Sequence, residues 1–483
     1  MMSRREFLEA AGAGVALLPL APRAHAREGV AERPSTPNVV LVMADDLGWG
    51  DVGFNGSKVV HTPHLDRLAA EGLRFTRFYA HAPVCSPTRG SCLTGRHPYR
   101  YGITFANVGH LPKQEFTLAE ALKTLGYTTG HFGKWHLGTL TKTVRDGNRG
   151  GRGDAAYAPP WDHGFDVCFS TESKVPTWNP MLVPGSADKP YGTRYWTGPE
   201  TPATENLEGD DSRVIADRVV PFVRDAVRAG KPFLAVVWFH TPHLPVLSSG
   251  KYLEMYKDKP PQQAHYYGAI TAMDEQVGRL RDELRALGVA NDTMLWFASD
   301  NGPEVGTPGS PGPFRGRKRS LYEGGVREPA FLVWPARVRQ ARSVDVPCCT
   351  SDYLPTVLAA LGFERKGQPE PLDGVSLLPL VDGAMAERPR PIAFESGGQL
   401  ALSDNRFKLY SPAPRGGRKG REQGAEQRTW ELYDLVADPA ETKDLAAQQP
   451  QVVERMRQTL DQWRASCRSS LAGDDYRRPS PTP

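Results

Sequence analysis

The sequence contains few cysteines, and they follow no recognisable spacing. Six occur among 483 residues, at positions 85, 92, 168, 348, 349 and 467, and no two of them form a Cys-x-x-Cys pair. Small disulfide-stabilised domains are much richer in cysteine, and zinc or thioredoxin-like sites need closely spaced pairs. A chain of this length can bury enough apolar surface to fold without cross-links. The cysteines therefore exclude a disulfide framework and give no support to a zinc site.

The sequence also lacks a strong charge imbalance and long hydrophobic runs. Lysine and arginine total 59, aspartate and glutamate total 55, and the formal net charge is +4. A nucleic-acid-binding protein normally presents a broad basic surface, which this balance does not favour. After residue 26 no segment is long and apolar enough to span a bilayer. We therefore expect a globular protein with no nucleic-acid partner and no stable membrane span.

Glycine and proline, in contrast, are abundant, with 48 and 43 residues. They are frequent in three long segments, residues 143–160, 184–210 and 302–319, which interrupt otherwise regular patterns. Segments of this composition form surface loops, and loops on a rigid scaffold often carry binding and catalytic residues. The composition therefore predicts a loop-rich protein whose chemistry borders these segments.

The first 26 residues have the pattern of a twin-arginine-type signal peptide. Arg4 and Arg5 precede a stretch of small and apolar residues over 10–21, and an Ala-His-Ala cleavage site ends at Ala26. The apolar run is short for a membrane span and is interrupted by Pro19. We therefore predict a signal peptide over residues 1–26 and a mature protein in the periplasm or outside the cell.

From residue 38 onward, short apolar runs alternate with helical patterns, which is typical of an α/β protein with a mainly parallel sheet. Thr117 and Glu120 form a capping box that predicts a helix start, and residues 262–287 carry apolar side chains at helical spacing. The runs that predict buried strands are residues 38–44, 127–132, 233–239, 293–298 and 330–334.

After residue 386 the alternation of buried strands and helices gives way to a different pattern. Short strand-like runs at residues 391–394, 407–410 and 429–433 are followed by a helical pattern over 451–463. These runs predict a small C-terminal α+β subdomain with an antiparallel sheet and a helix. The predicted organisation is a catalytic domain over 36–386, this subdomain over 387–473, and a flexible tail over 474–483.

Polar side chains with metal-binding or proton-transferring groups follow four of the predicted strands. Ligands of α/β sheets bind at the carboxyl ends of the strands. Three carboxylates and one amide form an oxygen-rich set that suits Ca²⁺ or Mg²⁺ better than zinc. Lysine and histidine side chains at the same edge of the sheet suit the binding of a tetrahedral oxyanion. The residues at these strand ends are Asp45, Asp46, Asp300 and Asn301 for the metal, and Lys134, His136 and His240 for the anion. Lys318, in the loop over residues 302–319, is a further candidate for the anion.

One motif points to a family. The segment Cys85-Ser86-Pro87-Thr88-Arg89, continued by Leu93-Thr94-Gly95-Arg96, resembles the signature of type I sulfatases, which convert this cysteine into formylglycine. The chain is similar to the branch of arylsulfatase A and N-acetylgalactosamine-6-sulfatase. The other segments that carry the resemblance are Asp45-Asp46-Leu47-Gly48, Gly133-Lys134-Trp135-His136-Leu137-Gly138, Phe239-His240-Thr241-Pro242-His243, Ser299-Asp300-Asn301-Gly302, Lys318 with Tyr322-Glu323-Gly324-Gly325-Val326-Arg327, and Leu432-Tyr433-Asp434-Leu435 with Asp438-Pro439.

The resemblance implies an alkaline phosphatase-like fold, a large mixed and mainly parallel sheet between helices, and a formylglycine-dependent hydrolase of sulfate monoesters. The substrate would be a sulfated carbohydrate or an aryl sulfate. A hydrated aldehyde at position 85 has two hydroxyl groups, one to attack sulfur and one to expel sulfate afterwards. A formylglycine-generating or sulfatase-maturing enzyme would then be a necessary partner.

The resemblance also implies a role for each matching residue. Asp45, Asp46, Asp300 and Asn301 would hold one divalent cation, Ca²⁺ in preference to Mg²⁺, together with the modified Cys85. The catalytic roles would be stabilisation of the hydrate by Arg89, sulfate binding by Lys134 and Lys318, proton removal by His136, and proton donation to the leaving alcohol by His240 with help from Lys318.

Several interpretations stay open from the sequence. A phosphonate or phosphate ester hydrolase could use the same scaffold, and a chain with an unmodified Cys85 would be a non-catalytic protein that binds anions or glycans. His243 is either a substrate contact or a structural histidine, and either Ser170 or Ser173 could contact sulfate. The aromatic residues that could either stack on a substrate ring or pack in the core are Trp178, Tyr191, Tyr195 and Trp196.

Overall fold

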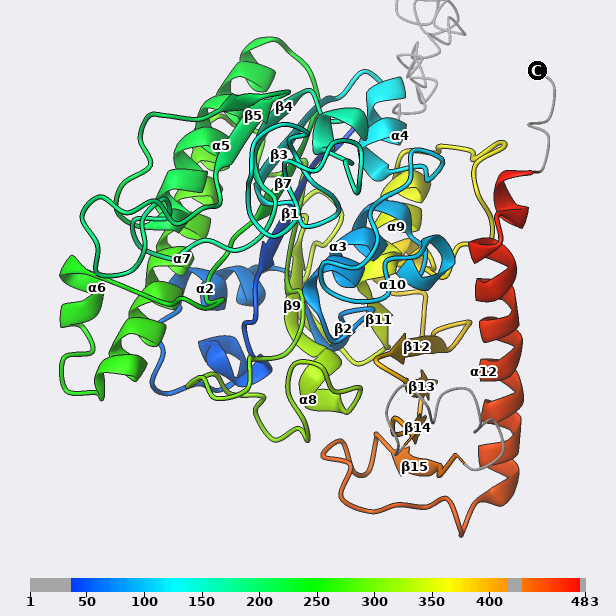
Figure 1. The fold of residues 1–483 in the computed structure, drawn as a ribbon. Helices are drawn as coiled ribbons and strands as arrows, with labels where there is room; N and C mark the ends of the chain where they lie inside the picture. The colour runs from blue at the N-terminus through cyan, green and yellow to red at the C-terminus, as the bar shows by residue number, and fades with distance from the viewer. Residues whose placement is uncertain (1–35, 415–427, 478–483) are drawn as a thin grey trace, which may run out of the picture. The chain divides into compact units, whose positions relative to one another are not determined.

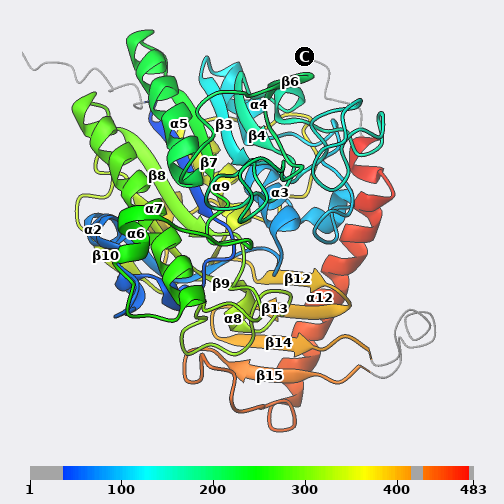
Figure 2. The same ribbon diagram turned by 60° about the vertical axis from the view of Figure 1, so that its left-hand side comes forward.

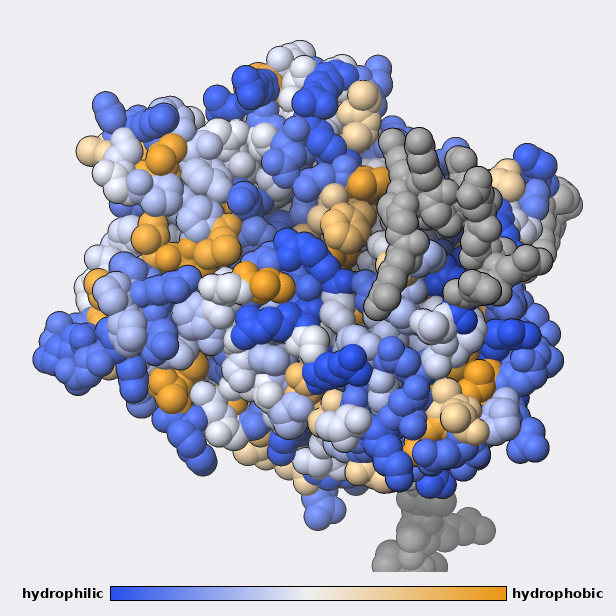
Figure 3. Space-filling view, turned by 60° about the horizontal axis from the view of Figure 1, so that its bottom comes forward, coloured by the Kyte–Doolittle hydropathy of each residue, from blue (hydrophilic) through white to orange (hydrophobic). Residues whose placement is uncertain are grey.

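The computed structural model describes residues 36–414 and 428–477. The predicted signal peptide, residues 1–26, lies outside the described residues, as do the last residues of the predicted tail. Within the described part, no helix combines the length and the apolar character that crossing a membrane requires. The face drawn in Figure 3 is mostly hydrophilic, with its hydrophobic residues in small scattered groups.

A mixed sheet of eleven strands forms the centre of the catalytic region (Figure 1). Its middle strands run parallel in the order β8-β1-β7-β3-β4, while β9 is antiparallel to both β8 and β2. The strands of this sheet are β1 (Asn38–Ala44), β2 (Leu73–Tyr79), β3 (Thr128–Lys134), β4 (Val167–Thr171), β5 (Tyr195–Gly198), β6 (Thr201–Pro202), β7 (Phe233–Trp238), β8 (Thr293–Ser299), β9 (Arg327–Val333), β10 (Arg342–Val344) and β11 (Cys348–Cys349).

Helices cover both faces of this sheet, which explains why its central strands are continuous apolar runs. All seven residues of β1 are buried. In Figure 1, α5 and α7 lie to the left of the central strands and α3 and α9 to the right; Figure 2 shows the same layers after rotation. The helices concerned are α2 (Pro63–Glu71), α5 (Asp211–Arg228) and α7 (Pro261–Ala286) on one face, and α3 (Cys85–Thr94), α4 (Leu118–Thr124) and α9 (Tyr353–Ala360) on the other.

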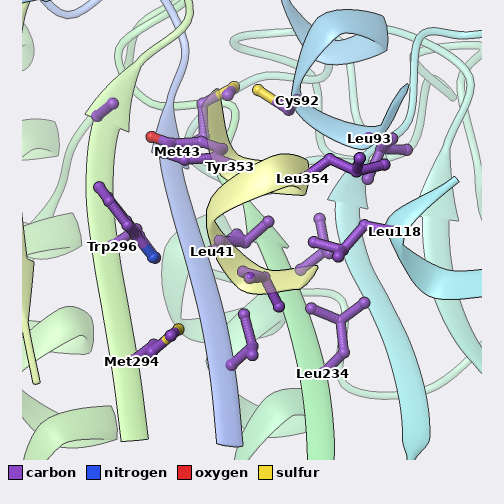
Figure 4. Packing of buried hydrophobic residues seen from close by; sticks show 14 of the residues in the cluster. Leu41, Met43, Cys92, Leu93, Leu118, Leu234, Met294, Trp296, Tyr353 and Leu354 are labelled. Atoms are coloured by element: carbon purple, nitrogen blue, oxygen red, sulfur yellow. The ribbon is translucent and has the colours of Figure 1, made fainter. Parts of the chain in front are cut away.

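Alternate residues of β1 supply the two hydrophobic cores. Leu41 and Met43 face the core shared with α3, α4 and α9, where Cys92 is a buried thiol. Figure 4 shows side chains of the strands and these helices meeting in that core. Val40 and Val42 face the core shared with α2, α5 and α7.

The predicted strands of the catalytic domain are confirmed as β1, β3, β7, β8 and β9. The predicted capping box is also confirmed, because Thr117 Oγ1 accepts from Glu120 N at 3.1 Å and Glu120 Oε2 accepts from Thr117 N at 2.7 Å. The helical pattern over 262–287 corresponds to α7. The strand β2, which the sequence pattern did not predict, pairs with β9 and β10.

The C-terminal region is an antiparallel sheet with one long helix, α12 (Pro450–Leu471), as predicted. Met456 and Leu460 of α12 pack on the leucines of the sheet. One strand, β13, was not predicted. The four strands are β12 (Ile392–Ser396), β13 (Gln399–Ser403), β14 (Phe407–Ser411) and β15 (Glu431–Asp434).

The flexible tail was predicted to begin at residue 474, but residues 474–476 are helical and make contacts with the catalytic domain. Asp474–Tyr476 form a short 3₁₀ helix. The Asp475 carboxylate accepts a hydrogen bond from Arg96 Nη2 at 2.6 Å, and the Tyr476 hydroxyl donates to Glu115 at 2.6 Å. An ion pair and a hydrogen bond therefore connect this segment to the catalytic domain beyond residue 473.

Candidate active site

The carboxyl ends of β1 and β8 bring four acidic or amide side chains together. The two strands are parallel neighbours, with Ala44 opposite Ser299, so the residue pairs that follow them are adjacent. Asp46 N donates to Asp300 Oδ1 at 3.1 Å, and Asn301 Nδ2 donates to Asp46 Oδ1 at 2.7 Å. The sequence-predicted metal ligands therefore form one buried cluster.

The chemistry of this cluster fits a divalent cation. Ligand atoms of Asp45, Cys85 and Asp300 lie within 4.8 Å of one another, as do those of a second group, Asp45, Asp46 and His243. Asp45 Oδ1 and Asn301 Oδ1 are buried and have no hydrogen-bond partner among the described residues. Burial, followed by repulsion from Asp45, raises the pKa of Asp300 to about 7. Buried oxygen acceptors without partners are costly, and a hard cation would satisfy them.

Cys85 is the first residue of α3, and its side chain lines a pocket of about 300 Å³ beside the carboxylate cluster. The start of a helix carries partial positive charge, which favours an anion there. Burial raises the pKa of the Cys85 thiol, so the unmodified side chain is a poor nucleophile at neutral pH. Arg89, one turn later, donates to Asp300 Oδ2 at 2.7 Å and to Lys134 O at 3.0 Å.

Two lysines line the same pocket. Lys134 Nζ lies 2.5 Å from Asp45 Oδ2, and Lys318 Nζ lies 2.6 Å from Asp46 Oδ1. Burial alone would lower the pKa of Lys318, but attraction to Asp46 outweighs it and holds that pKa above its ordinary value. Lys318 is therefore cationic, and with Lys134 and Cys85 it contributes to a pocket lining suited to a tetrahedral anion.

Two histidines also line the pocket, His136 and His243. Burial and the charge of Lys134 hold the pKa of His136 well below its ordinary value, so the ring is neutral and can accept a proton. The same two causes lower the pKa of His243 to about 4. His243 Nε2 lies 3.7 Å from Asp46 Oδ2, which places it between the carboxylate cluster and the pocket.

Comparison with known proteins decides the family. The sequence model of the family described as Sulfatase matches residues 37–363, more than half of the chain. The chain belongs to the sulfatase family. It is accordingly a sulfuric ester hydrolase, and the family is known for a metal ion and a formylglycine, for which this site offers an Asp-rich cluster and Cys85.

Relatives of known activity agree with this assignment. Arylsulfatase G of Rattus norvegicus is 32% identical over 478 residues, covering 87% of this chain and 85% of that protein. N-acetylgalactosamine-6-sulfatase of Canis lupus familiaris is 31% identical over 412 residues, covering 79% and 73%. The crystal structure of Ps i-CgsB matches with a TM-score of 0.75 and 26% identity, covering 89% and 93%. The predicted alkaline phosphatase-like fold is thereby confirmed.

The structure does not support the predicted role of His240 as a proton donor to substrate. Its ring is fully buried, and the described residues that line the pocket do not include it. Its Nδ1 lies 2.9 Å from Asp211 Oδ2, and its Nε2 lies 2.7 Å from Thr171 Oγ1. Both ring nitrogens are therefore engaged inside the protein, and His243 is the histidine of this segment that faces the pocket.

The two candidate serines and the four candidate aromatic residues lie in different surroundings. Ser173 lines the pocket, whereas Ser170 is buried and bonds His131 Nδ1 at 2.7 Å. Tyr195 and Trp196 are core residues, since both are almost completely buried and Tyr195 stacks on Phe169 at 4.0 Å between ring centroids. None of the four aromatic residues proposed for stacking is among the described residues that line the pocket.

Several pocket residues were not predicted from the sequence. Glu304 lines the pocket and lies 3.5 Å from Lys318, and it also pairs with Arg319. Asn107 and Asn148 reach the pocket from two loops and carry no motif. The only sequence signal for Glu304 is its position three residues after Asn301, in a loop already expected to border the site.

Proposed function

We propose that this sulfatase hydrolyses sulfate monoesters through a formylglycine made from Cys85 and a bound Ca²⁺ ion, after export from the cytoplasm. The observation that carries the proposal is the position of Cys85. It opens a helix beside the cluster of Asp45 and Asp300, in a pocket that Lys134 and Lys318 also line. A maturing enzyme that acts on the cysteine motif is then a required partner.

Each group has a place in the reaction. Asp45, Asp46, Asp300 and Asn301 would hold the cation together with position 85. A formylglycine hydrate at position 85 would supply the hydroxyl nucleophile, and a cation held by these residues would supply Lewis-acid stabilisation of negative charge.

The remaining steps belong to the protein's own side chains. Lys134 and Lys318 bind sulfate oxygens, and the Arg89 guanidinium holds Asp300 in place. His136 accepts a proton on its neutral ring. His243, together with Lys318, would give a proton to the departing alcohol oxygen. Burial and the charge of Lys134 disfavour protonation of the His243 ring, and the negative charge of a bound sulfate ester would act against both.

The proposed substrate class is sulfated carbohydrate, with aryl sulfates as simple analogues. One relative is named for N-acetylgalactosamine 6-sulfate chemistry, and Ps i-CgsB has a structure in complex with k-i-k-neocarrahexaose. The pocket lining supports this class because it combines the half-buried Phe105 with the exposed polar residues Asn148 and Lys174, a mixture that suits a sugar ring.

Mass analysis of the peptide that contains Cys85 tests the mechanism. Conversion to formylglycine replaces one sulfur and two hydrogens by one oxygen, and we expect this change in active protein. Cys85→Ala should abolish hydrolysis of p-nitrophenyl sulfate and of sulfated sugars while leaving the fold intact. An unaltered thiol in active enzyme, or activity in the alanine variant, would refute the mechanism. Faster turnover of the phosphate or phosphonate analogue would favour the other hydrolase class.

A further inference from the structure

Asn107 lies directly against His136 and is not part of any motif in the sequence. Its side-chain oxygen Oδ1 is 2.9 Å from His136 Nε2. The same oxygen accepts a hydrogen bond from Asn148 Nδ2 at 3.0 Å. The other ring nitrogen of His136, Nδ1, is buried and has no partner among the described residues. The two sides of the ring therefore have different environments.

This arrangement fixes the position of the proton on His136. A neutral imidazole carries one N–H, and an amide oxygen can only accept. Nε2 must therefore be the donor to Asn107, and Nδ1 keeps its lone pair. A base needs such a lone pair, and the tautomer of a histidine is set by the hydrogen bond that its other nitrogen makes.

Asn107 is itself held firmly in place. Its backbone φ is 62°, a left-handed conformation that asparagine tolerates better than most residues. Its carbonyl oxygen accepts from Arg149 Nη1 at 3.2 Å, and Arg149 Nη1 also donates to Gly109 O at 2.6 Å. Buried Glu172 accepts from Arg149 N at 2.9 Å and from Gly150 N at 3.0 Å. The arginine-rich loop near residue 149 thus braces the asparagine.

We propose that Asn107 is a positioning residue for this sulfatase, which holds His136 in the Nε2–H tautomer so that Nδ1 is available to accept a proton. The proposal rests on the proposed function only for the role of His136 as the base. The placement of the proton depends on the hydrogen bonds alone, and the two can be tested separately.

Two substitutions separate the side chain from the backbone. Asn107→Gly removes the amide, and glycine adopts the positive φ without strain. Asn107→Asp keeps an acceptor oxygen opposite Nε2. Asn179→Gly is the matched control, because Asn179 also has a positive φ, of 50°, and does not line the described pocket. Thermal unfolding of all variants checks that they remain folded.

Nitrogen NMR of ¹⁵N-histidine-labelled protein reads the tautomer directly, with the His136 signals assigned by their loss in His136→Gln. We expect the Nε2–H form in the wild type, in Asn107→Asp and in Asn179→Gly, and a tautomer mixture in Asn107→Gly. The proposal is overturned if the wild type carries its proton on Nδ1, or if Asn107→Gly keeps the wild-type tautomer.

Kinetics with a sulfate ester that the wild type turns over provide the second readout. Asn107→Gly should lower kcat about 10- to 100-fold, the range seen when a metal-ligating histidine loses the hydrogen-bond partner that fixes its tautomer, with KM little changed. Asn107→Asp should recover most of the loss. An unchanged kcat in Asn107→Gly would overturn the positioning role. If the NMR result holds and the wild type hydrolyses no sulfate ester, the proposed function fails while the tautomer assignment survives.

Discussion

Lys318 Nζ lies 2.6 Å and 2.8 Å from the two carboxylate oxygens of Asp46, a residue 272 positions earlier in the chain. Lys134 makes the equivalent contact with Asp45. Each lysine that faces the pocket is thus bonded to a carboxylate of the candidate metal cluster. The lysines proposed to bind sulfate and the carboxylates proposed to bind the cation are therefore electrostatically coupled. Substituting a lysine also changes the charge around the carboxylates, and substituting a carboxylate changes the charge around the lysines.

Removing the Lys318 ammonium should lower kcat/KM substantially. Lys318→Ala deletes a buried positive charge in the pocket, and loss of one preorganised group at developing negative charge typically costs about 10²–10³ in rate. Lys318→Arg should not restore activity, because the planar guanidinium does not reproduce the geometry of the ammonium. Steady-state kinetics with p-nitrophenyl sulfate measure the effect. Lys259→Ala, at an exposed position, is the control; near-wild-type turnover in Lys318→Ala would contradict the expectation.

The two histidines of the segment after β7 should respond differently to substitution. His243→Gln should reduce kcat about 10²–10⁴-fold, the usual contribution of a proton-transfer group, with little change in Tm, because His243 faces the pocket. His240→Gln should mainly reduce stability, by about 1–3 kcal/mol, since it disturbs buried contacts with Asp211 and Thr171. Kinetics and urea unfolding of both variants distinguish them. A large loss of kcat in His240→Gln with little change in His243→Gln would instead assign the proton donor to His240.

A divalent cation should stabilise the folded protein through the carboxylate cluster. Protein treated with a chelator should gain stability when Ca²⁺ is added, by about 2.7 kcal/mol at a concentration 100 times the Kd. Asp45→Asn should remove most of this gain, because Asp45 belongs to both candidate ligand groups. Urea unfolding with and without Ca²⁺ measures it, and Asp258→Asn on the surface is the control. An equal gain in Asp45→Asn would place the cation elsewhere.

Most of the strands that position this site could be predicted from the sequence, for a physical reason. Strands such as β1, buried on both faces, appear as continuous apolar runs, and parallel strands end at the same edge. Asp45 and Asp300 could therefore be placed together although they are far apart in the chain. β2 was not predicted because Arg74 and Arg77 interrupt its apolar residues. Arg77 is nevertheless buried, since its guanidinium donates to the carbonyls of Asp404 and Asn405.

The remaining errors concern side chains whose orientation depends on distant contacts. His240 and His243 are three residues apart in one turn, and either could face the pocket. His240 is turned into the core, where it makes hydrogen bonds with Asp211, 29 residues earlier, and with Thr171, 69 residues earlier. Asn107 comes from a loop without periodicity. Local sequence patterns carry no information on such pairings.

Acid should weaken the contacts of the Asp373 carboxylate, which accepts hydrogen bonds from Arg100 of the catalytic domain and, at 2.8 Å, from Trp463 Nε1 of α12. Burial would raise the pKa of Asp373, but its hydrogen bonds to Arg100, at 2.7 and 2.8 Å, outweigh burial and hold the pKa well below its ordinary value. Because the folded-state pKa is depressed, this stabilisation is complete above about pH 4, the pKa of an unfolded aspartate, and is lost as the pH falls further.

Asp373→Asn should therefore be less stable than the wild type at neutral pH and lose less stability on acidification. Urea unfolding at several pH values between neutral and strongly acidic conditions measures both effects. Asp382→Asn, at a surface ion pair with Arg337, is the control, since exposed pairs contribute little. Parallel pH profiles for the wild type and Asp373→Asn would contradict the assignment.

A buried lysine links the C-terminal sheet to the catalytic domain. Lys408 Nζ, on β14, lies 2.9 Å from Glu323 and 3.0 Å from Glu441, and all three side chains are fully buried. Glu323 opens the short helix that precedes β9. Burial would lower the pKa of Lys408, but the two carboxylates outweigh it and hold that pKa above its ordinary value, so the charge persists at neutral pH.

Lys408→Met should therefore lower the free energy of unfolding by about 3–5 kcal/mol, because it leaves buried Glu441 without a cation and leaves Glu323 paired with Arg327 alone among the described residues. Adding Glu441→Gln should recover part of this loss, since the carboxylate that was left without a cation is then replaced by a neutral amide. Urea unfolding followed by tryptophan fluorescence measures both variants. Lys443→Met, at an exposed position in the same region, should change stability by less than about 0.5 kcal/mol. If the double variant is no more stable than Lys408→Met, charge burial is not the cause of the loss.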